Sequence, residues 1–493
     1  MSETIALHND KLKKIRDIDE RLVSYNIEMT EVTGGTFWKK YTPKQIAGTE
    51  KFPAVKDFGE LSKMMQVYPP ADLYNEKLRR LAGALGSVYV RVSGSWATKT
   101  YYDFDGHTNG KAPQGYQSVL TREQWNGVLD FVKAVDAKLL ISVSNCEGDH
   151  VDGKPWTPEQ AKLLFDYSRD YGVPIAAAEF MNEPNVMEMA PPVKGYGPQD
   201  FGRDQDAFFR FIRENYPDVL LVGPCACGDS FDEKAAGAGS AILSVSTEEM
   251  LSWCKEPADV FSYHCYAGIS ERGASLGGHW DAKDALGERY LKVPENAVKY
   301  YAKIRDEHCP DGQMWVTESA DAGLGGNTWA STYLDVIRSA DELARFALMT
   351  DGVIFHNTLA SSDYGYLDRD THSPRPNYWL VYLWNHLMGT AVFDTGEEIR
   401  EGCHLYAHSR RDQKEGYAYL AINNSRTDSL CINVETSYDL WLLDAPDLRS
   451  GEIRLNGNTL CASENGEIAA LYPEKRDSGT ITIPPAALAF LIV

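Results

Sequence analysis

The sequence lacks long hydrophobic runs and any excess of positive charge. No run of about 18 apolar residues occurs in the 493-residue chain, so we predict no membrane-spanning segment. Residues Met1–His8 lack the basic and apolar regions of a signal peptide, and we expect a cytoplasmic protein. Lys and Arg total 49 against 71 Asp and Glu, a formal net charge of −22. This charge argues against nucleic acid or an anionic membrane as a partner, but not against a small acidic ligand.

Cysteine is sparse and irregularly placed. Nine cysteines are spread from Cys146 to Cys461, and their odd number and spacing match neither a disulfide framework nor a zinc site. The tight pair Cys225 and Cys227 is interpreted as core or loop. The number and spacing of the cysteines therefore predict free thiols in a reducing compartment. Since no His-x-x-x-His pair or carboxylate triad marks the candidate site described below, we also predict no metal and no cofactor.

Short apolar runs alternate with amphipathic stretches as far as about residue 391. The stretch 121–137, for example, has apolar residues at helical spacing and a Thr121/Gln124 capping pattern. This alternation predicts a (β/α)8 barrel over residues 21–391. A doubly wound sheet would alternate too, but the first strand is not followed by a Gly-rich phosphate loop. The predicted strands are 22–28, 88–94, 139–144, 175–178, 219–223, 260–266, 314–318 and 352–356.

The pattern changes after residue 391. Short alternating runs, separated by turn signals such as Asn456-Gly457-Asn458, predict an antiparallel β-sandwich over residues 392–493. Residues 1–20 precede the barrel, and their apolar run 4–7 is predicted to add a strand to that sandwich. Because the sandwich shows no obvious aromatic platform, we favour a role in bracing the barrel.

Two glutamates stand at the ends of predicted strands. Glu183 follows the fourth strand within Asn182-Glu183-Pro184, and Glu318 ends the seventh. In a parallel barrel these ends meet at the mouth, where active sites lie. A double-displacement glycosidase needs such a pair, here with Glu183 as acid/base and Glu318 as nucleophile. Alone, Glu183 reads equally well as a loop residue before a turn proline, and the second glutamate favours catalysis.

Other polar and aromatic residues near the strand ends are weaker candidates. Asn182 is placed to hydrogen-bond the sugar 2-hydroxyl. Tyr266, at the tip of the sixth strand, is placed to donate to Glu318 and hold it ionised, which we favour over a purely core aromatic. His264 is either a core histidine or a pocket residue. Aromatic residues in predicted mouth loops either stack on a sugar or pack in the ordinary way, namely Trp96, Tyr101, Tyr102, Trp280 and Trp329.

With these residues in these places, the chain resembles the clan A retaining (β/α)8 glycosidases. Within that clan it is most similar to glycoside hydrolase family 79, the heparanase and β-glucuronidase family. The segment 90–95 resembles the family's Arg-Phe-Gly-Gly-Thr strand, and 262–266 resembles its His-x-Tyr strand. The nucleophile loop is matched by 317–319 with Gly325-Gly326, and the last barrel segment by 364–368.

The resemblance implies several substrate-binding residues. Glu28, which ends the first strand, is expected near the sugar. Tyr364 and the backbone N–H groups of Gly325 and Gly326 are expected to hold a uronate carboxylate, a task that neutral donors can perform. Here the family's Tyr-Gly-Gly-Gly is Gly323-Leu324-Gly325-Gly326, which leaves the loop register open. The second strand ends in Ser93-Gly94-Ser95, and Ser95 and Trp96 are kept as supporting candidates.

We therefore expect a retaining exo-β-glycosidase, more specifically a β-glucuronidase that releases glucuronic acid from small β-glucuronides. The chain shows no Lys/Arg-rich heparin-binding patch, which favours exo action on small substrates over endo action on sulfated polymers. The alternatives are a retaining β-glycosidase for a neutral sugar (xyloside, glucoside or galactoside) and a non-catalytic carbohydrate-binding protein. The expected partner is a small-molecule glycoside, and the sequence leaves the oligomeric state open, a homo-oligomer included.

Overall fold

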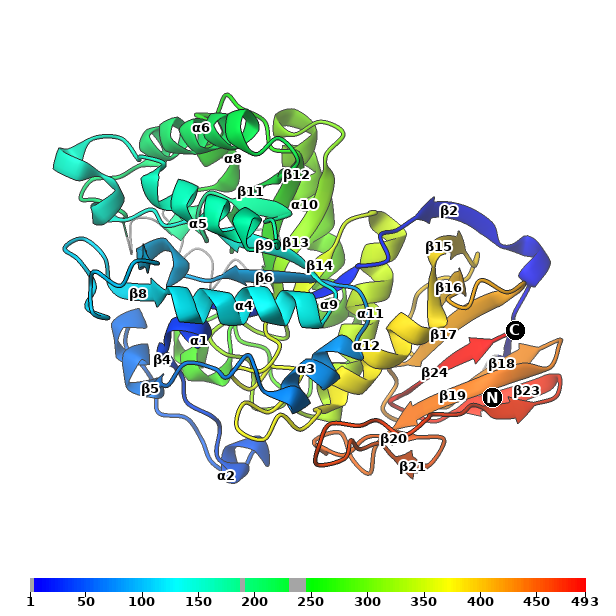
Figure 1. Cartoon of the computed structure of the whole chain (residues 1–493). Helices are drawn as coiled ribbons and strands as arrows, with labels where there is room; N and C mark the ends of the chain where they lie inside the picture. Colours follow the sequence, from blue (N-terminus) through cyan, green and yellow to red (C-terminus); the bar gives the residue numbers. More distant parts are fainter. Residues whose placement is uncertain (1–3, 187–190, 230–244) are drawn as a thin grey trace.

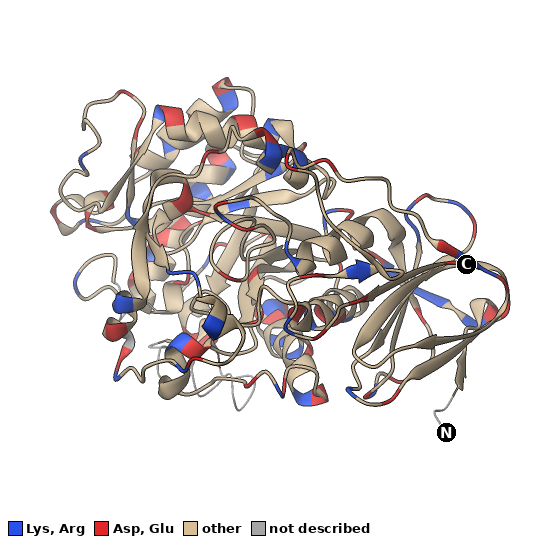
Figure 2. Cartoon of the chain, turned by 90° about the horizontal axis from the view of Figure 1, so that it is seen from below, with Lys and Arg blue, Asp and Glu red and all other residues tan. Residues whose placement is uncertain are grey.

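Two sheet assemblies organise the chain: a closed barrel and, beside it, a pair of sheets that includes both ends of the chain (Figure 1). The computed structural model describes residues 4–186, 191–229 and 245–493. Among these residues, no helix is both long enough and apolar enough to cross a membrane. Figure 2 shows acidic and basic residues interspersed along the outer helices and loops of both assemblies.

The barrel consists of the eight predicted strands in the predicted order, so the (β/α)8 prediction is confirmed. Neighbouring strands are parallel, and the register pair Val23–Ile354 joins the last strand to the first. All strand ends that carry candidate residues therefore lie at one mouth. The strands are β3 (Val23–Glu28), β6 (Tyr89–Ser93), β9 (Lys138–Ser142), β10 (Ala177–Glu179), β11 (Leu220–Ala226), β12 (Val260–Tyr266), β13 (Gln313–Ala320) and β14 (Ile354–His356).

Helices between the strands cover the barrel, and α4 shows how the sequence specifies them. The Thr121 side chain accepts a hydrogen bond from the Gln124 N–H, and the Gln124 side chain accepts one from the Thr121 N–H, so the predicted capping box is present. Trp125, Leu129 and Val132 lie on its buried face. The principal helices are α3 (Glu76–Gly83), α4 (Arg122–Ala134), α5 (Glu159–Asp170), α6 (Pro198–Asn215), α8 (Thr247–Leu251), α10 (Val293–His308), α11 (Tyr333–Met349) and α12 (Pro376–Leu387).

A small module between β3 and α3, which we call the mouth module (residues 29–68), was not predicted from the sequence. Its strands β4 and β5 pair antiparallel, and Phe37, Trp38, Val55 and Leu61 form a separate core against which Leu324 packs. The module therefore lies against the loop that follows β13, at the barrel mouth. Its elements are α1 (Met29–Thr33), β4 (Gly35–Trp38), α2 (Pro43–Ile46), η2 (Phe58–Met64) and β5 (Met65–Tyr68).

Several other loop insertions carry short elements. β7 and β8 pair in parallel beside α5, and η7 lies between β12 and α10. The remaining short elements are η1 (Asn9–Lys11), η3 (Ala97–Lys99), β7 (Thr100–Asp103), β8 (Ser118–Thr121), η4 (Glu147–Asp149), η5 (Val151–Gly153), η6 (Pro184–Val186), η7 (Glu271–Leu276) and α9 (Glu288–Leu291).

The second assembly is a β-sandwich of a nine-stranded and a three-stranded sheet. The N-terminal segment joins both sheets, because β1 pairs in parallel with β18 and β2 pairs antiparallel with β15. β15 begins at Met388, slightly before the boundary that the sequence indicated. The strands are β1 (Thr4–Ala6), β2 (Lys13–Asp17), β15 (Met388–Asp394), β16 (His404–Arg410), β17 (Tyr417–Asn423), β18 (Leu430–Val434), β19 (Tyr438–Asp444), β20 (Arg454–Leu455), β21 (Asn458–Thr459), β22 (Glu474–Arg476), β23 (Gly479–Ile483) and β24 (Ala487–Ile492).

A buried ionic cluster joins the sandwich to the barrel. His404 on β16 contacts Asp341 on α11 through one ring nitrogen and Glu288 on α9 through the other, at 2.7 Å. Arg345 Nε donates to Asp341 Oδ2 at 2.7 Å. Burial disfavours charge on the imidazole, but the Asp341 and Glu288 carboxylates outweigh it and raise the pKa of His404 to about 9. The two bodies are thus joined through a protonated histidine.

His404→Gln is expected to destabilise the docked sandwich by about 3–5 kcal/mol, because Asp341 loses a buried cationic partner. A histidine whose pKa is raised above its ordinary 6.5 stabilises the fold fully below that pH, and the stabilisation declines until it is lost above about 9. Melting temperatures of wild type and variant should therefore differ most at about pH 6.5 and just below it, and converge above about 9. The control is His386→Gln on the exposed surface of α12, expected to change stability by less than about 0.5 kcal/mol. Equal melting of wild type and His404→Gln at neutral pH would contradict the role of the cluster.

Candidate active site

The two glutamates meet at the mouth of the barrel. Glu318 lies within β13, and Glu183 lies just beyond β10 at a positive φ of 45°. A carboxylate oxygen of Glu183, one of Glu318 and a ring nitrogen of His264 all lie within 4.8 Å of one another. Carboxylates about 5–5.5 Å apart are typical of retaining glycosidases, whereas inverting enzymes hold them about 6.5–9.5 Å apart to admit water. The closeness of the two carboxylates leaves no room for the water of an inverting pair and fits the retaining arrangement.

Glu318 is held as an ionised acceptor. The Tyr266 hydroxyl donates to its Oε2 at 2.7 Å, and Arg91 Nη1 donates to its Oε1 at 3.0 Å. Burial favours the neutral carboxyl, but His264, Arg91 and Tyr266 outweigh burial and hold the pKa of Glu318 below its usual range. Both oxygens are therefore oriented and charged, as an attacking carboxylate requires.

Glu183 is the more accessible of the pair. Its side chain is 22% exposed against 7% for Glu318, so it faces the entrance. His264 Nδ1 lies 2.9 Å from Glu183 Oε1, and His264 Nε2 lies 3.4 Å from Arg91 Nη2. Because a carboxylate oxygen accepts, His264 Nδ1 donates to Glu183, and the same nitrogen lies 3.6 Å from Glu318 Oε2. Glu183, His264 and Glu318 also have the spacing of metal ligands, but this hydrogen bond accounts for their closeness.

Arg91 connects most of the site and was not among the predicted site residues. It lies within β6 and is 1% exposed. Its Nε contacts both carboxylate oxygens of Glu179 at 3.0 and 3.1 Å, and its Nη2 donates to Asn182 Oδ1 at 2.9 Å. The sequence signal that could have revealed it is a single cation inside the apolar run 88–94.

Asn182 and Glu28 are two further polar residues close to the pair of glutamates. Since Asn182 Oδ1 accepts from Arg91, its amide N–H groups are the donors left for a sugar hydroxyl. Glu28 ends β3, and burial followed by the Glu318 and Glu31 charges raises its pKa. Gly94, at φ 90°, leaves room for it, because a Cβ there would lie 1.6 Å from Glu28 Oε2. This approach explains the glycine in Ser93-Gly94-Ser95.

A hydrogen-bond chain links Glu318 to Tyr364. Asn357 Nδ2 lies 3.0 Å from the Tyr266 hydroxyl and 3.1 Å from the Tyr364 hydroxyl, and 3.3 Å from Glu28 Oε1. Its Oδ1 is buried without a partner in the described part of the chain. Asn357 directly follows β14, so the strand-end argument that found the glutamates would have found it as well.

The loop after β13 places Gly325 and Gly326 in the part of the mouth that contains Tyr364. Leu324, Gly325 and Gly326 have φ values of 62°, 84° and 82°. A Cβ on Gly326 would lie 3.1 Å from Tyr364 Cβ, and one on Gly325 would lie 2.6 Å from Trp38, so only glycine fits. Both glycines are buried, and neither N–H has an acceptor among the residues that the structure describes. Buried N–H groups without acceptors are rare and point to a ligand.

Other predicted residues do not join this group. Ser95 is exposed, its hydroxyl makes no hydrogen bond within residues 4–186, 191–229 and 245–493, and Trp96 is half-buried against the core. Of the two alternatives for the loop aromatics, sugar stacking or ordinary packing, three side chains are buried and pack inside the fold. They are Tyr102, Trp280 and Trp329.

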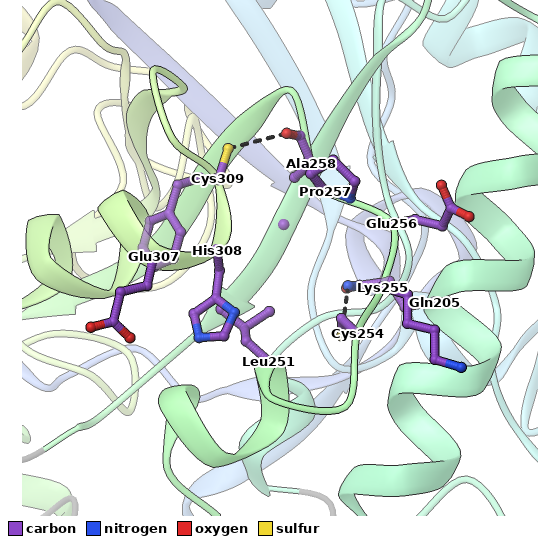
Figure 3. Close-up of a pocket in the computed structure, with 12 residues that line it drawn as sticks. Gln205, Leu251, Cys254, Lys255, Glu256, Pro257, Ala258, Glu307, His308 and Cys309 are labelled. Atoms are coloured by element: carbon purple, nitrogen blue, oxygen red, sulfur yellow. Dashed lines mark hydrogen bonds between the residues drawn. The ribbon is translucent and has the colours of Figure 1, made fainter.

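A cavity of about 210 Å³ lies at the opposite end of the barrel (Figure 3). Residues 254–258, just before β12, and Cys309, just before β13, line it. Cys309 Sγ donates to Ala258 O at 3.1 Å across one wall. It contains neither glutamate of the pair, so the mouth, not this cavity, is the candidate active site.

The chain is similar to several known proteins, although no protein-family description matches it. Heparanase-like protein 1 of Arabidopsis thaliana is 23% identical over 86% of this chain and 84% of its own. Baicalin-beta-D-glucuronidase of Scutellaria baicalensis is 23% identical over 76% and 72%. The crystal structure of a 4-O-alpha-L-rhamnosyl-beta-D-glucuronidase from Fusarium oxysporum superposes with a TM-score of 0.65, at 12% identity over all of both chains.

The fold, the glutamate pair and these relatives define a retaining glycoside hydrolase with a carbohydrate substrate. The resemblance to family 79, the heparanase and β-glucuronidase family, is confirmed by the same relatives.

Tyr266→Phe is expected to move the acidic limb of the pH dependence of kcat/KM to higher pH. The hydroxyl stabilises ionised Glu318, so its removal raises the pKa of that carboxyl. We expect a shift of about one pH unit, the scale of one hydrogen bond to a charged group. Tyr472→Phe, on a side chain 75% exposed in the sandwich, is the control and should leave the profile in place. An acidic limb at the wild-type pH in a folded Tyr266→Phe enzyme would argue against this contact.

Proposed function

We propose that the protein is an exo-acting β-glucuronidase that releases glucuronic acid from small β-glucuronides. The observation that carries this proposal is the pair of buried N–H groups of Gly325 and Gly326, which lack acceptors in the described residues and lie beside Tyr364. A carboxylate on the sugar would supply the missing acceptor. The names of the glucuronidase relatives support the same substrate class.

The proposed reaction uses the two glutamates in turn. Glu183, facing the entrance, donates its proton to the glycosidic oxygen while Glu318 attacks the anomeric carbon, so the bond to the aglycone breaks as the bond to Glu318 forms. Glu183 then takes a proton from water, whose oxygen attacks the same carbon and releases Glu318. The lowered pKa of Glu318 suits the nucleophile, because the carboxylate must be ionised before attack.

Neutral donors suit carboxylate recognition in this pocket. Burial, followed by the charges of Glu28 and Glu318, raises the pKa of Tyr364, so its hydroxyl stays protonated and can donate. Burial and the Glu318 and Glu31 charges also raise the pKa of Glu28, which disfavours a further negative charge beside the uronate. Two backbone N–H groups and one hydroxyl can then bind a carboxylate without a dedicated cation.

The mouth module supports exo action. Trp38 packs directly behind Gly325, and Tyr41 donates to Gly326 O at 2.6 Å, so a buried wall stands behind the proposed carboxylate site. In a hexuronic acid the carboxylate is next to O4, the position through which a chain would extend. A wall there leaves room for a terminal sugar and its aglycone.

A panel of aryl β-glycosides with one shared aglycone tests the proposal. The glucuronide and glucoside differ only at C6, so their comparison isolates the carboxylate. We expect kcat/KM for the glucuronide to exceed that for the glucoside by at least about a hundredfold, because unmatched buried donors reject the neutral sugar. The galactoside and xyloside complete the panel. A preference for any neutral sugar would overturn the glucuronide assignment and favour the neutral-sugar alternative.

A further inference from the structure

The carboxylate-binding loop is held from behind by one buried arginine. Arg272 in η7 is 2% exposed. Its Nη1 donates to Leu324 O at 3.0 Å and to Gly326 O at 3.1 Å, and its Nη2 donates to Asp363 Oδ2 at 2.8 Å. One guanidinium therefore ties the loop after β13 to the segment after β14.

The mouth module completes this arrangement, which we call the Arg272 clamp (Arg272, Tyr41 and Asp363). The Tyr41 hydroxyl accepts from Arg272 Nη1 at 2.8 Å, and its ring centre lies 3.8 Å from the guanidinium carbon. Arg272 Nη2 also donates to Lys39 O at 2.7 Å. The clamp therefore fixes three loops of the mouth relative to one another.

Because the peptide bond is planar, the contacts that fix the carbonyl groups of this loop also fix the directions of the two glycine N–H groups. In a trans peptide, the carbonyl and the following N–H point in opposite directions. Because Leu324 O faces Arg272, the Gly325 N–H points away from the clamp. Gly325 O accepts from Ser362 Oγ at 2.8 Å, so the Gly326 N–H points away from Ser362. Both donors are oriented before any substrate binds.

The clamp affects the glycine loop by orienting it and not by adding positive charge, since the Arg272 guanidinium is paired with the Asp363 carboxylate. The Asp363 carboxylate lies 2.8 Å from the guanidinium and neutralises it locally. The two terminal nitrogens of Arg272 donate to five backbone and side-chain acceptors, which a planar fork of donors can do. A lysine offers its donors from a single point and cannot bridge the same set.

We propose that Arg272 is a positioning residue for substrate specificity, which presets the Gly325 and Gly326 N–H groups for the sugar carboxylate without contacting the sugar. This inference rests on the β-glucuronidase function proposed above. Part of the substrate specificity would then depend on a side chain that lies behind the loop and does not contact the substrate. It also gives the mouth module a role, because Tyr41 and Lys39 belong to that module.

The test compares Arg272→Lys and Tyr41→Phe with wild type, using the aryl glucuronide and glucoside with one aglycone. The readout is the ratio of their kcat/KM values. We expect Arg272→Lys to lower this ratio at least about tenfold, the scale of one lost hydrogen bond to a charged group, mainly through KM for the glucuronide. Tyr41→Phe loses the hydroxyl bonds to Gly326 O and Arg272 Nη1 but keeps the arginine and its contacts with the loop carbonyls, so it should lower the ratio less.

The matched control is Arg345→Lys, a buried arginine in the ionic cluster between barrel and sandwich. It should lower the melting temperature and leave the ratio unchanged. An unchanged ratio in folded Arg272→Lys, in an enzyme whose wild type prefers the glucuronide, would overturn the clamp alone. A wild type that prefers the glucoside would overturn the proposed function and the clamp together. If Arg272→Lys does not fold, Tyr41→Phe decides, and a wild-type ratio there contradicts the proposal.

Discussion

The buried Arg91 guanidinium is the constraint on which the active site depends. It is the cation shared by Glu179 and Glu318, and it also orients Asn182. Two buried carboxylates without this partner would carry a desolvation cost of several kcal/mol each. By meeting that cost, Arg91 helps to keep Glu318 ionised within β13 and fixes the Asn182 amide beside Glu183, just beyond β10. The chemistry at the mouth thus depends on a side chain inside the barrel.

A second set of hydrogen bonds holds the glycine loop after β13, on which the proposed specificity depends, and one of its members belongs to the sandwich. Thr328, at the end of the glycine loop, donates to Glu271 Oε1 at 2.8 Å and accepts from Arg449 Nη1 at 3.0 Å. Arg449 belongs to the C-terminal assembly and also donates to Ile46 O of the mouth module at 2.7 Å. The bracing role expected for the sandwich therefore extends to the loop beside the proposed carboxylate site. The two assemblies act as one frame for that loop.

The sequence predicts the barrel well because each strand is a continuous apolar run and the parallel order makes every strand end meet at one mouth. The same rule locates Glu183, Glu318 and Tyr266. Arg91 escaped prediction because its role depends on the three carbonyl and carboxylate acceptors that folding brings around it. The mouth module escaped because its elements are short and lack a clear period. The role of loop aromatics such as Trp329 stayed open because spacing along the chain does not show which loops fold inward.

The central claim is that Glu318 is the nucleophile and Glu183 its acid/base partner in an active enzyme. The most direct test is inactivation by an activated β-glucuronide whose 2-hydroxyl is replaced by fluorine, followed by mass spectrometry of the digested protein. The account predicts one sugar per chain, attached to the peptide that contains Glu318, and no labelling of Glu318→Gln. Attachment to Glu183 or Glu28, or tight binding without any covalent label, would contradict it, and the second result would favour a carbohydrate-binding protein.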